Sequence, residues 1–175
     1  MKKSWVLVSF VLAVTFLAVG CSSGPKTTDN NNQEEVVFVG ETFENDFVSF
    51  TYPTEWKVTN ETNESIYTMI TLTKGDALSA DYFMVKIQKD DTTTPILDLV
   101  NQFAKLPNVN GTPAEMVTYG GTEYAKTSFN YGGMDQVHHQ ARVGGYLATI
   151  TLQGKDLEKD ENVINMMNSF NYKVQ

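Results

Sequence analysis

Hydrophobic and polar residues alternate along two neighbouring segments of the chain, 65–76 and 81–91, and each alternation predicts a β-strand. One face of these two strands is made by Ile66, Thr68, Ile70, Leu72, Phe83, Val85 and Ile87. Because successive side chains of a strand point to opposite faces of its sheet, we expect this face to be buried. Residues 47–53, which are rich in β-forming side chains and end at a proline, predict an earlier strand, and 55–60 predict another after a short turn.

The period of the pattern then changes twice, and both changes predict a helix. The apolar residues of "TTTPILDLVNQFAKLPN" recur at helical spacing, so we expect a helix from about Pro95 to Lys105 with Thr94 as its N-cap. Residues 156–170 return to this spacing, and Asp156 is the expected N-cap. The apolar face of this second helix is expected to contain Val163, Met166, Met167 and Phe170.

Three glycine pairs divide the region between the two helices into segments of strand length. The pairs are Gly120-Gly121, Gly132-Gly133 and Gly144-Gly145. Glycine tolerates the positive φ angles that tight hairpin turns require, so 122–131, 134–142 and 146–153 are expected to be successive antiparallel strands. The order strands, helix, strands, helix is typical of an α+β fold with an antiparallel sheet on which the helices pack.

The first 21 residues carry a different signal. Lys2 and Lys3 precede an uncharged segment, 5–19, which is shorter than the roughly 20 residues that cross a bilayer as a helix, and this is typical of a secretory signal peptide. The segment "LAVGC" resembles the lipobox of bacterial lipoproteins. The resemblance implies cleavage after Gly20 and a lipid on Cys21. The alternatives for this only cysteine are a buried thiol or half of a disulfide.

These boundaries give residues 1–20 as a lipoprotein signal peptide, 21–40 as the lipidated cysteine with a flexible polar tether, and 41–175 as one folded domain. The formal net charge of −8 becomes −10 when Lys2 and Lys3 leave with the signal peptide. Such an acidic domain repels phosphate backbones, so no nucleic-acid partner is expected, and the membrane is expected to be reached through the lipid on Cys21.

No set of residues in the sequence predicts catalysis, a metal site or a cofactor. The only histidines, His138 and His139, are adjacent in a predicted strand and therefore point to opposite faces, so they cannot share one metal ion. The alternation places His139 on the inner face and His138 on a polar, solvated face with Gln136, Gln140 and Arg142. A G-x-S-x-G motif is absent from the sequence, and we expect a protein that is not an enzyme.

Four larger side chains lie opposite the aliphatic face of the strands at 65–76 and 81–91. These are Tyr67, Met69, Tyr82 and Met84. If a helix covers this side of the sheet, they belong to the core; if it does not, they form an exposed patch of the kind that binds a partner.

The order of these features resembles the PsbP family. The residues that carry the likeness are "FVSFTYPTEWKV" at 47–58, the three strands separated by glycine pairs, and a closing helix that ends in "MMNSFNY". The resemblance implies an α/β/α sandwich, in which helices flank a central antiparallel sheet. Plant members of this family are extrinsic subunits that help to assemble photosystem II, which implies binding rather than catalysis.

Together these observations predict a lipid-anchored lipoprotein on the extracytoplasmic face of a bacterial cell membrane. We expect it to be a non-enzymatic binding or assembly factor for an envelope protein or complex. The alternative is a carrier or sensor that holds a small ligand between the sheet and a helix.

Overall fold

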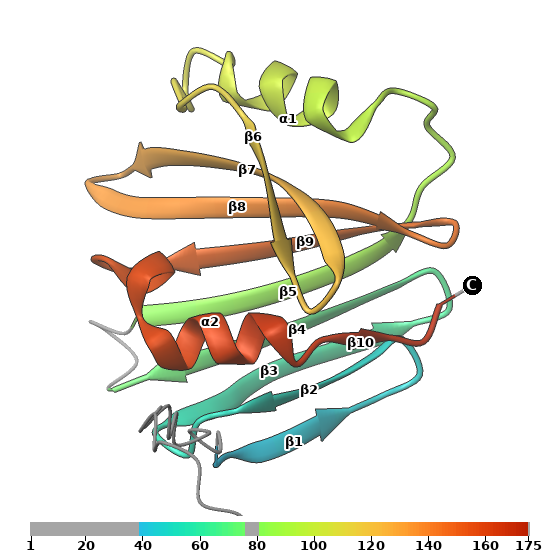
Figure 1. The fold of residues 1–175 in the computed structure, drawn as a ribbon, viewed down its shortest axis with the longest axis vertical. Coiled ribbons are helices and arrows are strands. Elements are labelled where there is room, and N and C mark those ends of the chain that lie inside the picture. Colours follow the sequence, from blue (N-terminus) through green and yellow to red (C-terminus); the bar gives the residue numbers. More distant parts are fainter. Residues whose placement is uncertain (1–38, 76–80, 175) are drawn as a thin grey trace, which may run out of the picture. The chain divides into compact units, whose positions relative to one another are not determined.

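A seven-stranded antiparallel sheet lies at the centre of residues 39–75 and 81–174, the parts of the chain that the computed structural model describes (Figure 1). These residues belong to one compact unit, Val36–Gln175. The strands follow the order β3 (Trp56–Glu64), β4 (Tyr67–Lys74), β5 (Asp81–Lys89), β9 (Tyr146–Gln153), β8 (Met134–Val143), β7 (Thr122–Tyr131) and β6 (Glu115–Tyr119).

The predicted signal peptide, the cleavage after Gly20, the lipidation of Cys21 and the tether up to residue 38 lie outside the described residues. Within 39–75 and 81–174, no helix is both long and apolar enough to cross a membrane.

The glycine pairs are hairpin turns, as the sequence predicted. Gly120, Gly121, Gly132, Gly133 and Gly144 all have positive φ, between 55° and 85°. They join β6 to β7, β7 to β8 and β8 to β9, and each strand pairs with the next in an antiparallel register. The segments 122–131, 134–142 and 146–153 are therefore consecutive strands, as expected.

A small sheet and a helix cover one face of the large sheet. The strands β1 (Glu41–Glu44), β2 (Val48–Tyr52) and β10 (Asn171–Tyr172) pair in the order β1-β2-β10, and α2 (Glu161–Asn168) lies beside them (Figure 1). Phe50 of the small sheet stacks on Phe170 with ring centroids 4.6 Å apart, and Phe83 of β5 lies 6.0 Å from Phe170. Burial of these apolar surfaces is the main stabilising contribution of this layer.

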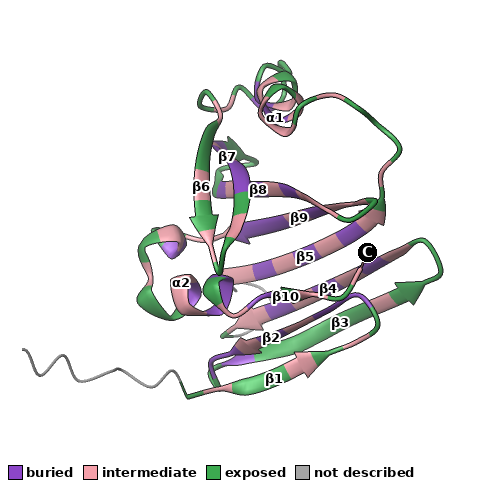
Figure 2. Cartoon of the chain, turned by 45° about the vertical axis from the view of Figure 1, so that its right-hand side comes forward, coloured by how far each residue is buried: buried purple, intermediate pink, exposed green. Residues whose placement is uncertain are grey.

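The other face is covered only in part. The helix α1 (Ile96–Ala104) contacts β7 and β8, where Val100 and Ala104 are buried (Figure 2). On this side of β4 and β5, every second residue is only half-buried. Among the described residues, the layer formed by α1 therefore covers one half of this face, and no helix or second sheet covers the other half.

This arrangement differs in part from the expected α/β/α sandwich. Strands make up 53% and helices 15% of the described residues. One outer layer combines a helix with a second sheet and the other is a single short helix, so the fold is dominated by sheet. The short strands β1, β6 and β10 were not predicted, because β1 and β10 are brief and mostly polar and β6 carries no strong alternation.

Both predicted N-caps are wrong. The α1 helix begins after Pro95, which occupies the N-cap position without a side-chain capping bond, so Thr94 has no such role. Asp156 instead precedes a single 3₁₀ turn, η1 (Leu157–Lys159), and α2 begins later with Asp160 as its N-cap. The Asp160 carboxylate accepts a hydrogen bond from the backbone N–H of Asn162 at 2.9 Å.

Ile66 also differs from its predicted place. It lies in the turn between β3 and β4 and is 58% exposed, whereas Ile70 and Leu72 are fully buried. The alternation therefore held for β4 itself but extended one residue too far.

Candidate functional site

The strand register gathers a set of side chains on the half-covered face of the large sheet. Met84 of β5 lies opposite Thr151 of β9, Thr151 lies opposite His138 of β8, and His138 lies opposite Thr127 of β7. Residues directly opposite each other in an antiparallel sheet point to the same face, so these four form one row across four strands.

The helix α1 covers one end of this row. Its Phe103 stacks on His138 with ring centroids 5.1 Å apart, and Phe129 of β7 meets the same imidazole edge-on at 4.6 Å. The prediction that His138 lies on a solvated face is therefore wrong, because that face is covered by α1 at β7 and β8. Burial lowers the pKa of His138 to about 4, so the imidazole is neutral at neutral pH.

A cavity of about 350 Å³ opens between α1, the loop that follows it and the sheet. We call it the α1 cleft. Its lining comprises Tyr82, Met84, Phe103, Asn108, Val109, Phe129, Tyr131, Gln136, His138 and Thr151. None of these residues is acidic, and none is a lysine or an arginine.

One buried side-chain oxygen in the lining of the α1 cleft has no partner among the described residues. Thr151 is 1% exposed, and its Oγ1 forms no hydrogen bond with any described residue. Gln136, by contrast, donates from Nε2 to Oε1 of Gln153 at 2.8 Å. A buried hydroxyl without a partner costs about 1–3 kcal/mol, so Thr151 is a place where a bound group would stabilise the protein.

Arg142 holds the N-terminal end of α1 against the sheet. From β8, its Nε donates to Oδ2 of Asp90 at 2.7 Å, and a second nitrogen donates to Oγ1 of Thr92 at 2.7 Å. A third bond runs from the guanidinium to the carbonyl oxygen of Thr94. The hydrogen bond from Arg142 holds the pKa of Asp90 below its usual range. This role of Arg142 could not be predicted from the residue pattern, because Arg142 lies among polar residues of a strand.

The C-terminal end of α1 is held as firmly. The backbone N–H of Gly111 donates to the carbonyl of Ala104 at 2.8 Å, and Asn101 Oδ1 accepts from the N–H of Ala114 at 2.9 Å. Thr112 then pairs with Ser128 of β7 through two hydrogen bonds, one of 2.8 Å and one of 3.0 Å. The wall that α1 contributes to the cleft is thus fixed at both ends.

The four residues of the predicted partner patch share a face but are divided between two cavities. Tyr82 and Met84 line the α1 cleft. Tyr67 and Met69 line a second cavity of about 480 Å³, which we call the Met69 cavity; Ile66, Lys86, Gln88 and Lys89 complete its lining. All four patch residues are half-buried, and their role as a partner patch stays a prediction.

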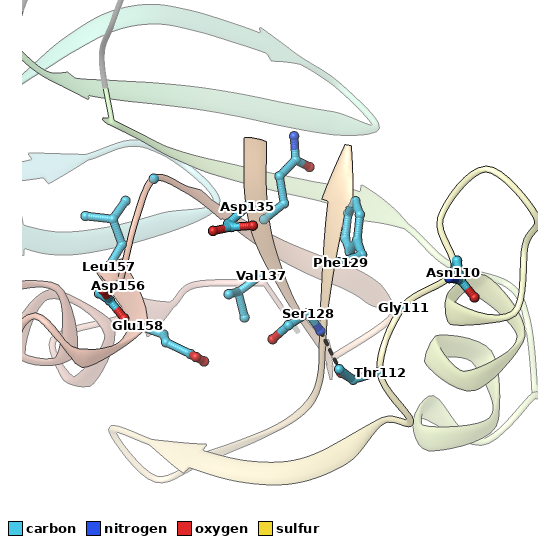
Figure 3. A pocket seen from close by; sticks show the side chains of 12 residues that line it. Asn110, Gly111, Thr112, Ser128, Phe129, Asp135, Val137, Asp156, Leu157 and Glu158 are labelled. Atoms are coloured by element: carbon cyan, nitrogen blue, oxygen red, sulfur yellow. Dashed lines mark hydrogen bonds between the residues drawn. The ribbon is translucent and has the colours of Figure 1, made fainter. Parts of the chain in front are cut away.

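A third cavity, of about 460 Å³, lies on the other side of Phe129 and Gln136 and is drawn in Figure 3. Asp135, Asp156 and Glu158 are among its lining residues. Two of these carboxylates are already paired, since Lys159 donates to Asp156 at 2.7 Å and Lys126 donates to Glu158 at 3.2 Å. In the ranges 39–75 and 81–174, no group of three histidine, cysteine, aspartate or glutamate residues is placed to hold a metal ion.

His139 lies on the opposite face of β8, in the main core, as the alternation predicted. It is 1% exposed, and its imidazole makes edge-to-face contacts with the rings of Tyr119 and Tyr124, at centroid distances of 5.6 and 6.3 Å. Neither ring nitrogen has a hydrogen-bond partner among the described residues. Burial, together with the charge of Lys126, lowers its pKa to about 3.

No model of a protein family matches the chain, and no curated protein sequence matches it significantly. Among solved structures, the cyanobacterial PsbP (CyanoP) of Synechocystis sp. PCC 6803 is similar, with a TM-score of 0.53 and 15% sequence identity over 75% of this chain and 91% of that one. The fold is PsbP-like. At this identity the similarity concerns the fold of the PsbP-like domain and carries no residue of a site.

Two further structures are similar at lower scores. A protein of Bacteroides thetaiotaomicron VPI-5482 has a TM-score of 0.46 and 14% identity over 76% of this chain and 48% of its own length, so the chain spans about half of that protein. LpqN of Mycobacterium tuberculosis, which is involved in cell envelope biogenesis, has a TM-score of 0.44 and 14% identity over 71% of this chain and 82% of its own.

Proposed function

We propose that this protein is a non-enzymatic binding protein on the extracytoplasmic face of a bacterial cell membrane. The observation that carries the proposal is the half-covered face of the large sheet. There, aromatic and methionine side chains are left half-buried beside two cavities, while α1 is fixed at both ends. Aromatic and methionine side chains on a rigid support are typical of surfaces that bind partners.

The proposed location follows from the first 21 residues. A signal peptide with a lipobox-like end directs the chain out of the cytoplasm, and lipid on Cys21 after cleavage behind Gly20 holds it at the membrane. One acyl chain binds a membrane only marginally, so stable anchoring needs the two or three chains typical of bacterial lipoproteins.

The partner proposed for the Met69 cavity is an envelope protein or complex. Tyr67 and Met69 give this cavity an apolar part, and Lys86 and Lys89 give it two cations in a strongly acidic chain. A surface of this kind fits an apolar segment flanked by acidic residues, because the cations attract such a segment while the rest of the domain repels it.

In-cell crosslinking with affinity capture and mass spectrometry tests this function. We expect the wild-type chain to capture a defined envelope protein and Cys21→Ala to lose it. Met69→Lys, which places a charge in the cavity, should weaken the capture, whereas Val58→Lys, at an exposed apolar residue of β3, should not. Absence of any specific partner, or equal capture by all four chains, would contradict the proposal.

A second function is favoured by the α1 cleft, which lies between sheet and helix. A carrier or sensor of a small ligand needs a concave, mostly apolar site with a few polar groups, and the cleft has this character. Native mass spectrometry of the chain released from membranes distinguishes the two functions, because a carrier retains a small molecule and a docking protein does not.

A further inference from the structure

We propose that the α1 cleft binds an uncharged ligand with a ring-sized apolar body and one hydrogen-bonding group that pairs with Thr151. The inference rests on the second of the two functions proposed above and names the chemical class of its ligand.

The lack of acidic and basic side chains in the lining of the α1 cleft argues against an ionic ligand. The chain has 21 acidic and 13 basic residues, yet the cleft is lined by none of them. An anion would find no cation there, and a cation would find no carboxylate. Transfer of an unpaired ion from water into such a site is strongly unfavourable, whereas a neutral ligand avoids this cost.

The walls of the cleft suit a flat ring. Phe103 and His138 are stacked, and Phe129 stands nearly perpendicular to both, at 76° and 83°. Aromatic groups pair favourably in offset-stacked and edge-to-face arrangements, and these three present both a face and an edge. Met84 on the floor contributes a flexible, polarisable thioether that adapts to the outline of the ligand.

The residues at the base of the cleft indicate the hydrogen-bonding group of the ligand. Thr151 lies between Met84 and His138 in the cross-strand row, and its hydroxyl is buried without a partner among the described residues. A hydroxyl or carbonyl on the ligand would pair with it and remove the cost of leaving it unpaired. The neutral imidazole of His138, which carries one donor and one acceptor nitrogen, is the neighbouring group that can support such a bond.

Bonds within the chain itself hold the walls of the cleft. Arg142 fixes the start of α1, and the bonds at Gly111 and Thr112 fix its end, so Phe103 is held over the sheet. A preformed site saves the ordering cost that a flexible site would have to meet on binding.

The test uses three fluorinated probes and the full chain in lipid nanodiscs, with empty nanodiscs as background. The probes are 4-fluorophenol, 4-fluorotoluene, which lacks the hydroxyl, and 4-fluorobenzoate, which is an anion. ¹⁹F NMR line broadening gives the affinity of each probe. We expect 4-fluorophenol to bind best, 4-fluorotoluene to bind more weakly and 4-fluorobenzoate not to bind above background.

Two variants then locate the bond. Thr151→Val keeps the β-branched shape and removes the hydroxyl. It should lower the affinity for 4-fluorophenol about 5- to 10-fold and leave the affinity for 4-fluorotoluene unchanged. Thr149→Val is the matched control, since Thr149 lies on the same strand and face but does not line the cleft. Thermal melts of both variants verify that they are folded.

Three results would overturn the inference: benzoate binding as tight as that of the phenol, no probe binding above empty nanodiscs, or an unchanged phenol affinity in Thr151→Val. None of these depends on the capture of an envelope protein, so the inference can fail while the docking function stands. Conversely, failure to capture a protein partner together with intact probe binding would contradict the docking function and support the inference.

Discussion

The environments of His138 and His139, which are adjacent in β8, depend on which layer covers each face of the sheet. Both are neutral and surrounded by aromatic rings, but His138 faces α1 and its cleft whereas His139 faces the main core. The sequence predicted the inward position of His139 from alternation alone. It could not predict the burial of His138, because alternation does not say whether a second layer covers the outer face.

The stability of the domain is predicted to depend on pH through these histidines. Burial lowers the pKa of His139 to about 3 and that of His138 to about 4, whereas an unfolded histidine titrates near 6.5. The unfolded chain therefore binds protons that the folded chain rejects, and stability falls as the pH drops below about 6.5. For His139 alone the free energy of unfolding should decrease by about 2 kcal/mol between pH 7 and pH 5.

Urea unfolding at pH 7, 6 and 5 measures this dependence. The variant His139→Phe keeps an aromatic ring beside Tyr119 and Tyr124 and removes one titrating group, so its curve should be flatter. Carboxylates such as Asp90, whose pKa is lowered, contribute only at more acidic pH and do not obscure the window. An equal slope in wild type and His139→Phe would count against the burial argument.

At the scale of elements, the position of α1 depends on one side chain from a neighbouring strand. Arg142 bonds three groups of the connection between β5 and α1, and the side chain of its partner Asp90 is only 8% exposed. A planar guanidinium satisfies several acceptors at once, and an ammonium group cannot reproduce this geometry.

Substitution of Arg142 is expected to release the start of α1. Arg142→Ala removes the bonds of the guanidinium and leaves Asp90, whose Oδ1 still accepts from Thr92, without its cation. It should lower the free energy of unfolding by about 2–4 kcal/mol, and Arg142→Lys should recover only part of this loss. Hydrogen exchange at the amides of α1 is the specific measurement, since it should accelerate more than exchange in β4 and β5. Lys89→Ala, at an exposed residue near the same connection, is the control. Uniform acceleration across the domain would mean that Arg142 acts only on global stability.

The turn between β6 and β7 makes a similar contact with α2. Gly120 has φ +55°, its N–H donates to Oδ1 of Asn168 at 3.0 Å, and an added Cβ would overlap the Asn168 carbonyl. Gly121 also has positive φ, but open space surrounds it. Gly120→Ala should therefore lower the free energy of unfolding by about 1–3 kcal/mol and Gly121→Ala by about 1 kcal/mol, as denaturant titrations can measure. Equal losses would show that the contact with α2 is unimportant.

Elements that carry a strong local pattern could be predicted from the sequence, and those that depend on a distant partner could not. Alternation and glycine turns in the sequence predicted the strands β4, β5, β7, β8 and β9. The two-residue turn at Gly132-Gly133 also determines that Thr127 pairs with His138, so this part of the cross-strand row could be predicted from the sequence. The helical pattern of 95–105 gave the helix, but nothing in it specified that Phe103 packs on β7 and β8.

At the scale of the whole domain, the class of fold was predictable and its layering was not. A central antiparallel sheet with few helices follows from the order of patterns. In the small sheet only β2 was predicted, as the strand at 47–53. The strands β1 and β10 are short and mostly polar, and β10 pairs with a segment more than 100 residues away in the sequence, so neither left a local signal. The candidate binding site lies where the layers are unequal. Residue patterns therefore indicated Tyr82 and Met84 of its lining but missed Thr151 and Phe103, as well as the supporting role of Arg142.

The pairing of β10 with β2 also bears on the order of events in synthesis. Tyr172 lies opposite Val48, and its hydroxyl meets that of Tyr124 at 2.8 Å, so the layer over the main core closes only with residues made late. At about 5–20 residues per second, on the order of 10 s separates the emergence of these two strands from the ribosome. Until β10 emerges, the small sheet that covers the aromatic face of the large sheet is incomplete. A growing chain in which the large sheet has emerged and β10 has not is therefore vulnerable to aggregation, and a holdase that shields apolar strands would protect it at that stage.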